Sequence, residues 1–148
     1  MNDERDRAAD EAQIRALIDA RSEAIRAKDV DRATAMMATD VLLFDVVKPL
    51  QYAGLEALRK RLAEWFASFE VVIAHELRNV SVAACHDVAF SHSFNRVVAI
   101  KKDGQRIDMW WRATVCYRKI DDRWLITHEH ASVPFDVPSG KASVDLKP

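Results

Sequence analysis

Two histidines, His128 and His130, stand two residues apart near the end of the chain, in the stretch Trp-Leu-Ile-Thr-His-Glu-His-Ala-Ser. Residues at this spacing on a β-strand project from the same face. Because the charge of histidine changes close to neutral pH, such a pair suits general acid and base chemistry. Two other interpretations stay open: a metal pair completed by His92, or hydrogen-bonded structural histidines.

Two short turns determine which side chains share a face with these histidines. Asp103-Gly104 and Asp121-Asp122 each separate two segments of alternating polarity, a pattern typical of β-hairpins with two-residue loops. Opposed residues in an antiparallel pair share a face, as do alternate residues along each strand. The predicted register therefore gathers one largely apolar face from Phe90, His92, Phe94, Arg96, Val98, Met109, Trp111, Ala113, Val115, Tyr117, Ile126, His128 and His130.

Polar side chains on this predicted face indicate a cavity. Burying an unpaired polar group costs about 1 to 3 kcal/mol, so His92, Arg96 and the histidine pair are easier to place around a cavity than in a solid core. We expect Arg96 either to anchor a carboxylate, phenolate or enolate or to pair with an internal acid. We expect aromatic residues of the same face in the cavity wall: Phe94, Trp111 and Tyr117.

The opposite face of the predicted sheet suggests a surface for a partner. This face is richer in aromatic and paired polar groups than a surface that contacts only solvent: Trp110, Arg112, Thr114 and Glu129. We expect a homodimer to form through this face.

Composition limits the possible functions. The 148 residues, 49% hydrophobic and 30% charged, suit one domain with a real core. A net charge of −1 without a Lys/Arg-rich run argues against nucleic acid or an anionic membrane as a partner. Two cysteines, Cys85 and Cys116, are too few for a disulfide framework and fit reduced thiols in a cytoplasmic protein. No signal-peptide or membrane-length apolar run is present in the sequence.

Hydrophobic periodicity changes from helical to strand-like at residue 69. This order predicts an α+β domain, with helices covering one face of a curved, mainly antiparallel sheet. The expected elements are a polar segment at 1–9, helices at 10–28, 31–37 and 55–66, a short strand at 41–45, four long strands at 71–84, 88–101, 105–119 and 123–133, and an extended tail at 136–148. The predicted domain spans 10–135.

The element order, an Asp at the end of Val41-Leu-Leu-Phe-Asp45, and the final Arg-Trp-x-Ile-x-His-x-His-x-Ser strand together resemble the nuclear transport factor 2-like superfamily. Its members include ketosteroid isomerase, the SnoaL-like polyketide cyclases and the association domain of calcium/calmodulin-dependent protein kinase. The resemblance covers about Ala12 to Phe135. It implies a cone-shaped fold with a pocket between the helices and the concave sheet, and a dimer through the sheet. The fold alone does not define an activity.

The resemblance also implies roles for particular residues. Asp45 matches the isomerase's general base, and Arg96 falls near a pocket arginine of the kinase association domain, which implies an anion-friendly cavity. The isomerase's oxyanion pair of a Tyr and a protonated Asp is not evident, because Ala113 or Val115 stands where the acid is expected. Tyr52 and His75 are further candidates at the cavity mouth.

Together these observations predict a small-molecule pocket in which Asp45 removes a proton next to a carbonyl while Arg96 and the histidines stabilise the enolate. Such a protein is a cofactor-independent isomerase, cyclase or lyase and needs no metal. The alternative is a non-catalytic ligand-binding or oligomerisation module with the same pocket. A metal enzyme built on His92, His128 and His130 is a third hypothesis. The three predicted helices that precede the sheet argue against it.

Overall fold

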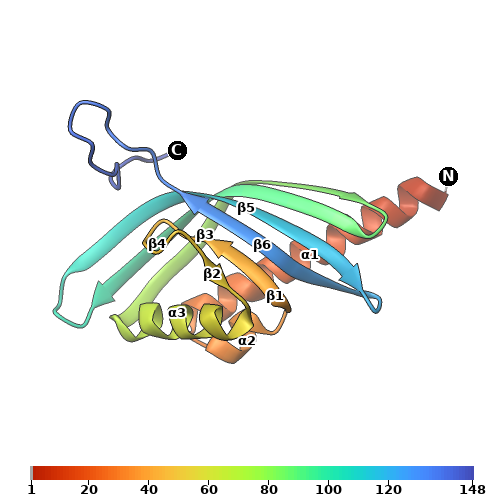
Figure 1. The fold of residues 1–148 in the computed structure, drawn as a ribbon, viewed down its shortest axis with the longest axis horizontal. Coiled ribbons are helices and arrows are strands. Elements are labelled where there is room, and N and C mark those ends of the chain that lie inside the picture. The colour runs from red at the N-terminus through yellow and green to blue at the C-terminus, as the bar shows by residue number, and fades with distance from the viewer. Residues whose placement is uncertain (1) are drawn as a thin grey trace.

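The computed structural model describes residues 2–148 as a curved six-stranded sheet with helices packed on its concave side (Figure 1). The elements in chain order are α1 (Asn2–Arg26), α2 (Val30–Thr34), β1 (Met37–Phe44), β2 (Tyr52–Ala53), α3 (Leu55–Ala67), β3 (Phe69–Cys85), β4 (Val88–Lys101), β5 (Arg106–Ile120) and β6 (Arg123–Ser132). The predicted α+β architecture is confirmed.

Helix α1 is longer than the periodicity predicts, because it begins at Asn2 instead of Asp10. Residues 2–9 contain neither Gly nor Pro, and Asp3 and Glu4 in the first turn suit the positive end of the helix dipole. The N-terminal turns project beyond the sheet, while Ile14, Ala24 and Ile25 farther along are buried (Figure 1). Helix α1 therefore packs against the sheet from Asp10 onward, where the Asp10 carboxylate accepts the indole N–H of Trp124.

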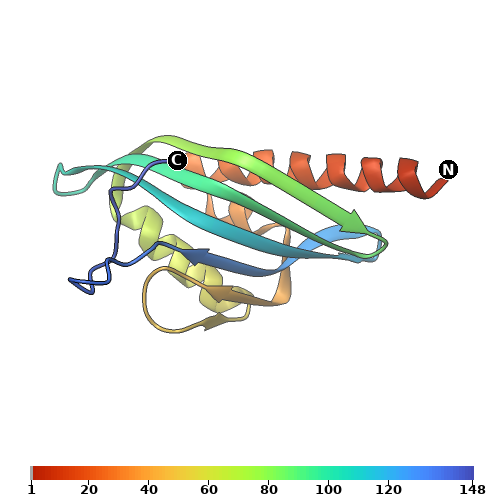
Figure 2. The same ribbon diagram turned by 90° about the horizontal axis from the view of Figure 1, so that it is seen from above.

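The strands lie in the order β2-β1-β6-β5-β4-β3 (Figure 2). Strands β3 to β6 form the predicted antiparallel meander, and β1 joins β6 in parallel. The second helix ends at Thr34, before the predicted residue 37, because Met37 and Val41 belong to β1 and are buried in the main core. Asp45 follows directly after β1, and the short β2 is an addition to the predicted elements.

The predicted register of the β4–β5 hairpin is wrong by one residue. Val97 lies opposite Met109 and Val98 opposite Asp108, so the loop has three residues, 102–104. A two-residue type I′ loop needs two left-handed residues, whereas only Gly104, with φ of +86°, is left-handed here. The even-numbered residues of β4 consequently face the convex side of the sheet.

The β5–β6 hairpin has the predicted two-residue loop, with Asp121 and Asp122 at φ of 50° and 60°. Its pairing begins as expected, with Tyr117 opposite Ile126, but it then shifts by one residue. The shift leaves Thr127 without a partner and places His128 opposite Cys116. This β-bulge turns His128 and His130 to the convex face and Glu129 to the concave face.

The main core lies where α1, α3 and the first strand meet the concave face. Ile14, Leu58, Tyr117 and Ile126 are among its buried members. Beyond β6 the tail bridges Phe135 to Ala142 and leaves the sheet on its convex side (Figures 1 and 2). No helix within residues 2–148 is long and apolar enough to cross a membrane.

Replacing Gly104 with Ala tests the origin of the three-residue loop. Beyond the adjoining residues, no atom lies within 4 Å of the position that an alanine Cβ would occupy, so the cost is that of the left-handed backbone alone. We expect Gly104→Ala to lower the free energy of unfolding by about 1 to 2 kcal/mol, measured by urea denaturation. Gln105→Ala, at an exposed neighbouring residue, is the control. Equal stability of Gly104→Ala and wild type would contradict this account.

Candidate functional site

A cavity of about 190 Å³ lies between the concave face of the sheet, α1 and α3. Most of its wall is apolar and includes two tryptophans, Trp65 and Trp111. Polar groups reach it from both helices and from most of the strands: Arg21, Ser22, Asp45, Arg61, His75, Ser91, Ser93, Asn95, Tyr117 and Glu129. Such a mixture of apolar wall and few polar groups is typical of a small-molecule site.

Four of the residues predicted for the site line this cavity: Asp45, His75, Trp111 and Tyr117. Asp45 accepts the backbone N–H of Val46 on Oδ1 (2.7 Å) and the Nε–H of Arg61 on Oδ2 (2.9 Å). The Asp45 side chain is 16% exposed and that of Arg61 is 18% exposed. The acid is therefore present in the cavity as predicted, but both of its oxygens are already engaged.

The predicted histidine cluster lies outside the cavity. His92, Phe94 and Arg96 face the convex side because of the three-residue β4–β5 loop, and His128 and His130 do so because of the bulge at Thr127. Phe44 packs edge-on against the His128 and His130 rings, at centroid distances of 4.7 and 5.4 Å. His128 Nδ1 lies 2.7 Å from the Leu42 carbonyl oxygen. The structure thus gives this pair packing contacts instead of a place in the cavity.

Metal binding by the histidines finds no support in the geometry. No group of three or more His, Cys, Asp or Glu side chains suited to a metal ion occurs in residues 2–148.

Tyr52 also lies away from the cavity wall, and its hydroxyl donates to the Lys48 carbonyl oxygen at 3.0 Å.

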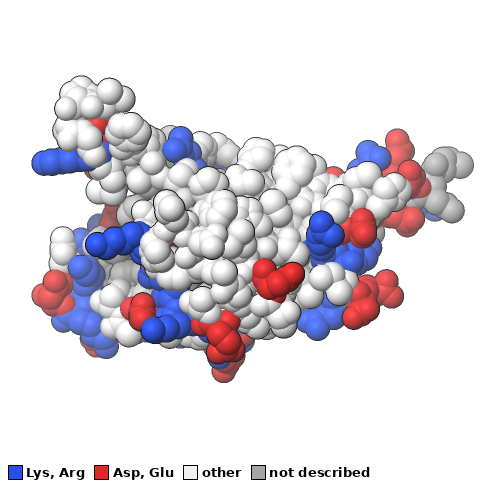
Figure 3. Space-filling view, in the orientation of Figure 1, with Lys and Arg blue, Asp and Glu red and all other residues white. Residues whose placement is uncertain are grey.

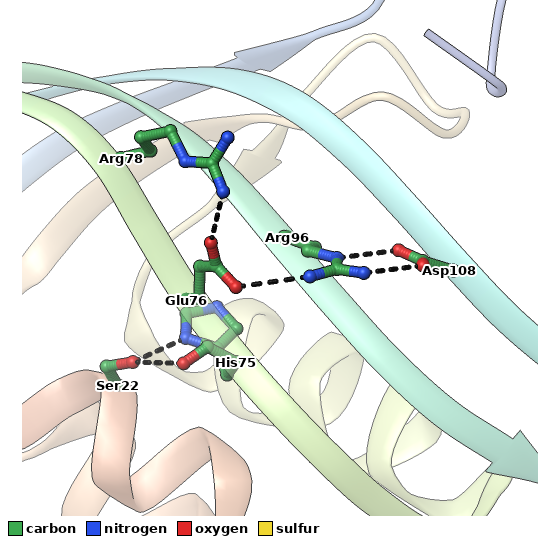
Figure 4. Close-up of polar contacts among 6 residues, drawn as sticks. All are labelled: Ser22, His75, Glu76, Arg78, Arg96 and Asp108. Atoms are coloured by element: carbon green, nitrogen blue, oxygen red, sulfur yellow. Dashed lines mark hydrogen bonds and ion pairs between the residues drawn. The ribbon is translucent and has the colours of Figure 1, made fainter. Parts of the chain in front are cut away.

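Arg96 belongs to an ion-pair chain on the convex face (Figure 4). Its guanidinium binds both carboxylate oxygens of Asp108, at 2.8 and 2.7 Å, and reaches Glu76 at 3.3 Å. The hydrogen bonds that Arg96 donates to the Asp108 carboxylate are the main cause of the raised pKa of Arg96. Arg78 and Arg96 lie over the Trp110 ring, at 4.8 and 5.6 Å from its centroid. The arginine expected to attract an anion into the cavity is therefore committed to the opposite face.

Glu129, predicted for the outer partner surface, points into the cavity and pairs with Arg21 of α1. Arg21 Nη2 donates to Glu129 Oε2 at 2.7 Å, and both side chains are largely buried. Burial alone would lower the pKa of Arg21, but the charge of Glu129 and its hydrogen bond raise it overall. The buried Nε of Arg21 has no hydrogen-bond partner among residues 2–148.

His75 on β3 faces α1 across the cavity wall (Figure 4). Ser22 Oγ lies 2.7 Å from His75 Nδ1 and donates to the His75 carbonyl oxygen at 3.2 Å. No residue in 2–148 hydrogen-bonds to Nε2. Burial, followed by the positive charge of Arg21, lowers the pKa of His75 to about 4, although Glu129 opposes this shift. The imidazole is therefore uncharged at neutral pH.

Two further hydrogen bonds order the polar groups of β4 and β5. The hydroxyls of Ser91 and Tyr117 lie 2.8 Å apart, and burial raises the pKa of Tyr117 to about 12. Ser93 Oγ donates to Asn95 Oδ1 at 2.6 Å. Both Ser91 and Asn95 are buried, each with less than a tenth of its surface exposed.

Six polar residues of the site are not predicted from the sequence: Arg21, Ser22, Arg61, Ser91, Ser93 and Asn95. The alternation Ser91-x-Ser93-x-Asn95-x-Val97 is the one signal that points to the correct face of β4, because it places small and amide side chains where a cavity needs room. Helix α1 offers no comparable signal, since Arg21 and Ser22 are typical surface residues of a helix.

Comparison with known proteins supports the architecture. A family model described as a SnoaL-like domain matches residues 14–136, and the chain therefore belongs to the SnoaL-like domain family of nuclear transport factor 2-like proteins. No protein of curated function matches the chain. It is 34% identical to an NTF2-like protein of unknown function from Pseudomonas putida KT2440, over 95% of this chain and 98% of that one, with a TM-score of 0.86.

Two more distant solved structures share the fold. A nuclear transport factor 2 superfamily protein from Salmonella enterica serovar Typhimurium is 15% identical, with a TM-score of 0.80 over 92% of this chain and 99% of that one. A ketosteroid isomerase-like protein from Erwinia carotovora atroseptica is 22% identical, with a TM-score of 0.71 over 82% of this chain and 94% of that one.

The lowered pKa of His75 predicts a dependence of stability on pH. The ordinary pKa of histidine is 6.5, so between about pH 6.5 and 4 the unfolded chain binds a proton that the folded protein does not. The free energy of unfolding must therefore fall as the pH is lowered through this window. The contribution of His75 to this fall is on the order of 3 kcal/mol. Below pH 4 His75 adds no further loss.

Urea unfolding of wild type and His75→Gln between pH 4 and 7 measures this contribution. We expect the variant to lose less stability than wild type over the window, because it lacks the titrating imidazole. Parallel losses in the two proteins would contradict the assignment of His75 as a buried neutral base.

Proposed function

We propose that the protein is a cofactor-independent enzyme that moves a proton next to the carbonyl group of a small uncharged compound, as an isomerase, cyclase or lyase does. The observation that carries this proposal is the buried His75, held by Ser22 and uncharged at neutral pH in the wall of a largely apolar cavity. Membership of the SnoaL-like family and the fold shared with a ketosteroid isomerase-like protein support it.

Ser22 sets which nitrogen of His75 is the base. The serine has one hydroxyl proton, and the His75 carbonyl oxygen accepts it. Ser22 Oγ is then the acceptor for the Nδ1–H of the imidazole, so that the lone pair lies on Nε2. Nε2 has no partner within residues 2–148, and it is the atom that takes the substrate proton. A base with a pKa of about 4 is compatible with this chemistry, because a ketosteroid isomerase general base titrates only slightly higher.

The charges of the cavity favour an uncharged substrate. Arg21 is paired with Glu129 and Arg61 with Asp45, so each buried cation has a carboxylate beside it. Bringing an unpaired charge into such a cavity would cost several kcal/mol of desolvation without a free counter-ion to offset it. The apolar wall with Trp65 and Trp111 fits an aromatic or alicyclic skeleton.

Asp45 is the competing base, since the resemblance to the isomerase assigns proton transfer to this position. Its engagement with Arg61 and the Val46 N–H holds its two oxygens in place and favours His75 as the base. Asp45 with Arg61 then closes the cavity wall beside the end of β1.

Exchange of ketone α-protons in deuterated water, followed by proton NMR, tests the proposal. We expect the protein to accelerate exchange in para-methylacetophenone and α-tetralone, and to act far less on para-acetylbenzoate, which has a carboxylate in place of the methyl group. His75→Gln should lose about 100-fold or more of this rate, while Asp45→Asn keeps most of it.

His86→Gln is the matched control, because His86 is exposed in the turn between β3 and β4. Two results would overturn the proposal: no acceleration by wild type with either uncharged ketone, or full activity in a folded His75→Gln protein. Binding of the ketones without exchange would favour the non-catalytic ligand-binding module.

We also propose that two copies associate through the convex face. Thr114 and Arg112 are exposed there in the middle of the sheet, beside Trp110, and Phe90 is 49% exposed. In Figure 3, which looks at the β1–β2 edge of the sheet, charged side chains gather toward α2, α3 and the N-terminal end of α1, while the middle of the view has few of them. On the convex face the aromatic groups adjoin charges that are paired with one another in the chain from Arg78 to Asp108, and such a face suits a partner of the same kind. Glu129 is not part of this surface.

Sedimentation velocity tests the association. We expect wild type to sediment with twice the 16.8 kDa mass of the chain, and Thr114→Arg, which adds two like charges across a symmetric contact, to shift it to the monomer. Ala20→Arg on the exposed side of α1 is the control and should remain dimeric. A monomeric wild type, or a dimeric Thr114→Arg, would contradict this arrangement.

A further inference from the structure

Asn95 is a buried polar residue whose amide is only half used. Its Oδ1 accepts the hydroxyl proton of Ser93 at 2.6 Å, and 8% of the residue is exposed. With Oδ1 turned to the Ser93 hydroxyl, the NH2 group is the end of the amide that remains for another partner. No acceptor for that NH2 occurs in residues 2–148, yet Asn95 lines the cavity. Among the described residues the one fully buried side-chain donor without a partner is Arg21 Nε, so the NH2 of Asn95 keeps accessible surface and is open to a ligand oxygen in the cavity.

The sheet register brings this amide close to His75. His75 lies opposite Val97 and Leu77 opposite Asn95, so His75 and Asn95 are diagonal neighbours on adjacent strands. Both point to the concave face and both line the cavity. Diagonal pairs of this kind are about 7 to 8 Å apart at their backbones, which leaves room for one small molecule to contact both side chains.

Trp111 completes this corner of the cavity. It lies opposite Asn95 on β5, and its ring centroid is 6.0 Å from that of His75. The base, the amide donor and a flat apolar wall thus converge from three consecutive strands. Arg21 contributes its charge to the same corner, as the lowered pKa of His75 indicates.

We infer that Asn95 is a catalytic residue whose Nδ2–H groups bind the substrate's carbonyl oxygen, with Ser93 as the positioning residue that fixes the amide. This inference rests on the proposed function and identifies the residue that stabilises the negative charge on the substrate's oxygen. It further restricts the substrate to compounds in which a hydrogen-bond-accepting carbonyl lies next to the carbon that loses the proton.

The step balances within the substrate and His75. The bond between the α-carbon and hydrogen breaks, and the proton moves to His75 Nε2. The electron pair of that bond forms the carbon–carbon double bond, while the carbonyl π electrons move to the oxygen. Negative charge therefore grows on the oxygen facing Asn95, where the N–H donors stabilise it more strongly than they stabilise the ketone. His75 returns the proton to another atom of the same molecule or to water, and nothing is oxidised or reduced.

The Asn95→Asp variant tests this role with little change of shape. The carboxylate can still accept the Ser93 hydroxyl, but it replaces the donor facing the substrate with an acceptor. With para-methylacetophenone we expect the maximal exchange rate to fall about 100-fold to 1,000-fold, the range for loss of one oxyanion donor. Asn95→Ala should show a similar fall, and Ser93→Ala a smaller one, because the amide remains but is free to rotate.

Two further measurements separate catalysis from a structural role. The pH dependence of the rate should keep the acidic limb set by His75 in Asn95→Ala, since the base is untouched. Phenol, whose oxygen imitates the enolate, should bind more weakly to Asn95→Ala than to wild type, whereas toluene should bind both equally. Asn79→Asp, an exposed asparagine on β3, is the matched control and should exchange at the wild-type rate.

The outcomes distinguish this inference from the proposed function. If His75→Gln abolishes exchange while folded Asn95→Asp and Asn95→Ala retain the full rate, the role of Asn95 is wrong and the proposed function stands. If a replacement at Asn95 prevents folding, equal rates for Ser93→Ala and wild type overturn the inference instead. Unchanged phenol affinity in Asn95→Ala would overturn it as well.

Discussion

The ion pair between Arg21 and Glu129 is the interaction on which the site depends. It joins α1 to β6, elements 108 residues apart in sequence, across the top of the cavity at 2.7 Å. Breaking a buried pair by removing one partner costs about 3 to 5 kcal/mol, since the remaining charge is left uncompensated. The same pair places the positive charge that helps to keep His75 neutral and holds Ser22, the next residue of α1, against that imidazole. One contact therefore joins the helix to the sheet and, after burial, which is the larger cause, Arg21 of this pair helps to lower the pKa of the proposed base.

The two faces of the sheet differ in how their charged side chains are arranged. On the concave side each cation is paired and the remaining polar groups are neutral, so the cavity offers hydrogen bonds without a net charge. On the convex side Arg78, Glu76, Arg96 and Asp108 form an open chain of alternating charges beside Trp110 (Figure 4). The proposed chemistry on an uncharged compound and the proposed contact with a second copy would place these different demands on the same strands.

Residue patterns in the sequence are sufficient to predict the fold but not to predict which side chains line the cavity. Long strands and amphipathic helices leave periodic signals, and Asp45, Trp111 and Tyr117 line the cavity as expected because the β1 end and the β5 alternation are unambiguous. His92, Arg96, His128 and His130 are predicted on the wrong face because a single extra residue, in a loop or at a bulge, reverses a strand from that point on. Val97 and Val98, both apolar, give no pattern against which to check the β4 register. Contacts such as Ser22 to His75 depend on how α1 packs, which no local pattern encodes.

The period of two along β4 has a consequence for how such a protein diverges. Ser91, Ser93 and Asn95 belong to the cavity, while His92, Phe94 and Arg96 between them belong to the outside. Point substitutions can alter one row without changing the other, so the lining of the cavity and the outer face of β4 can diverge independently. Insertion or deletion of one residue in the strand would exchange the two rows at once. Lineages of this fold should therefore tolerate changes of residue type in β4 far more readily than changes of its length, and confine their length variation to the hairpin tips and the tail.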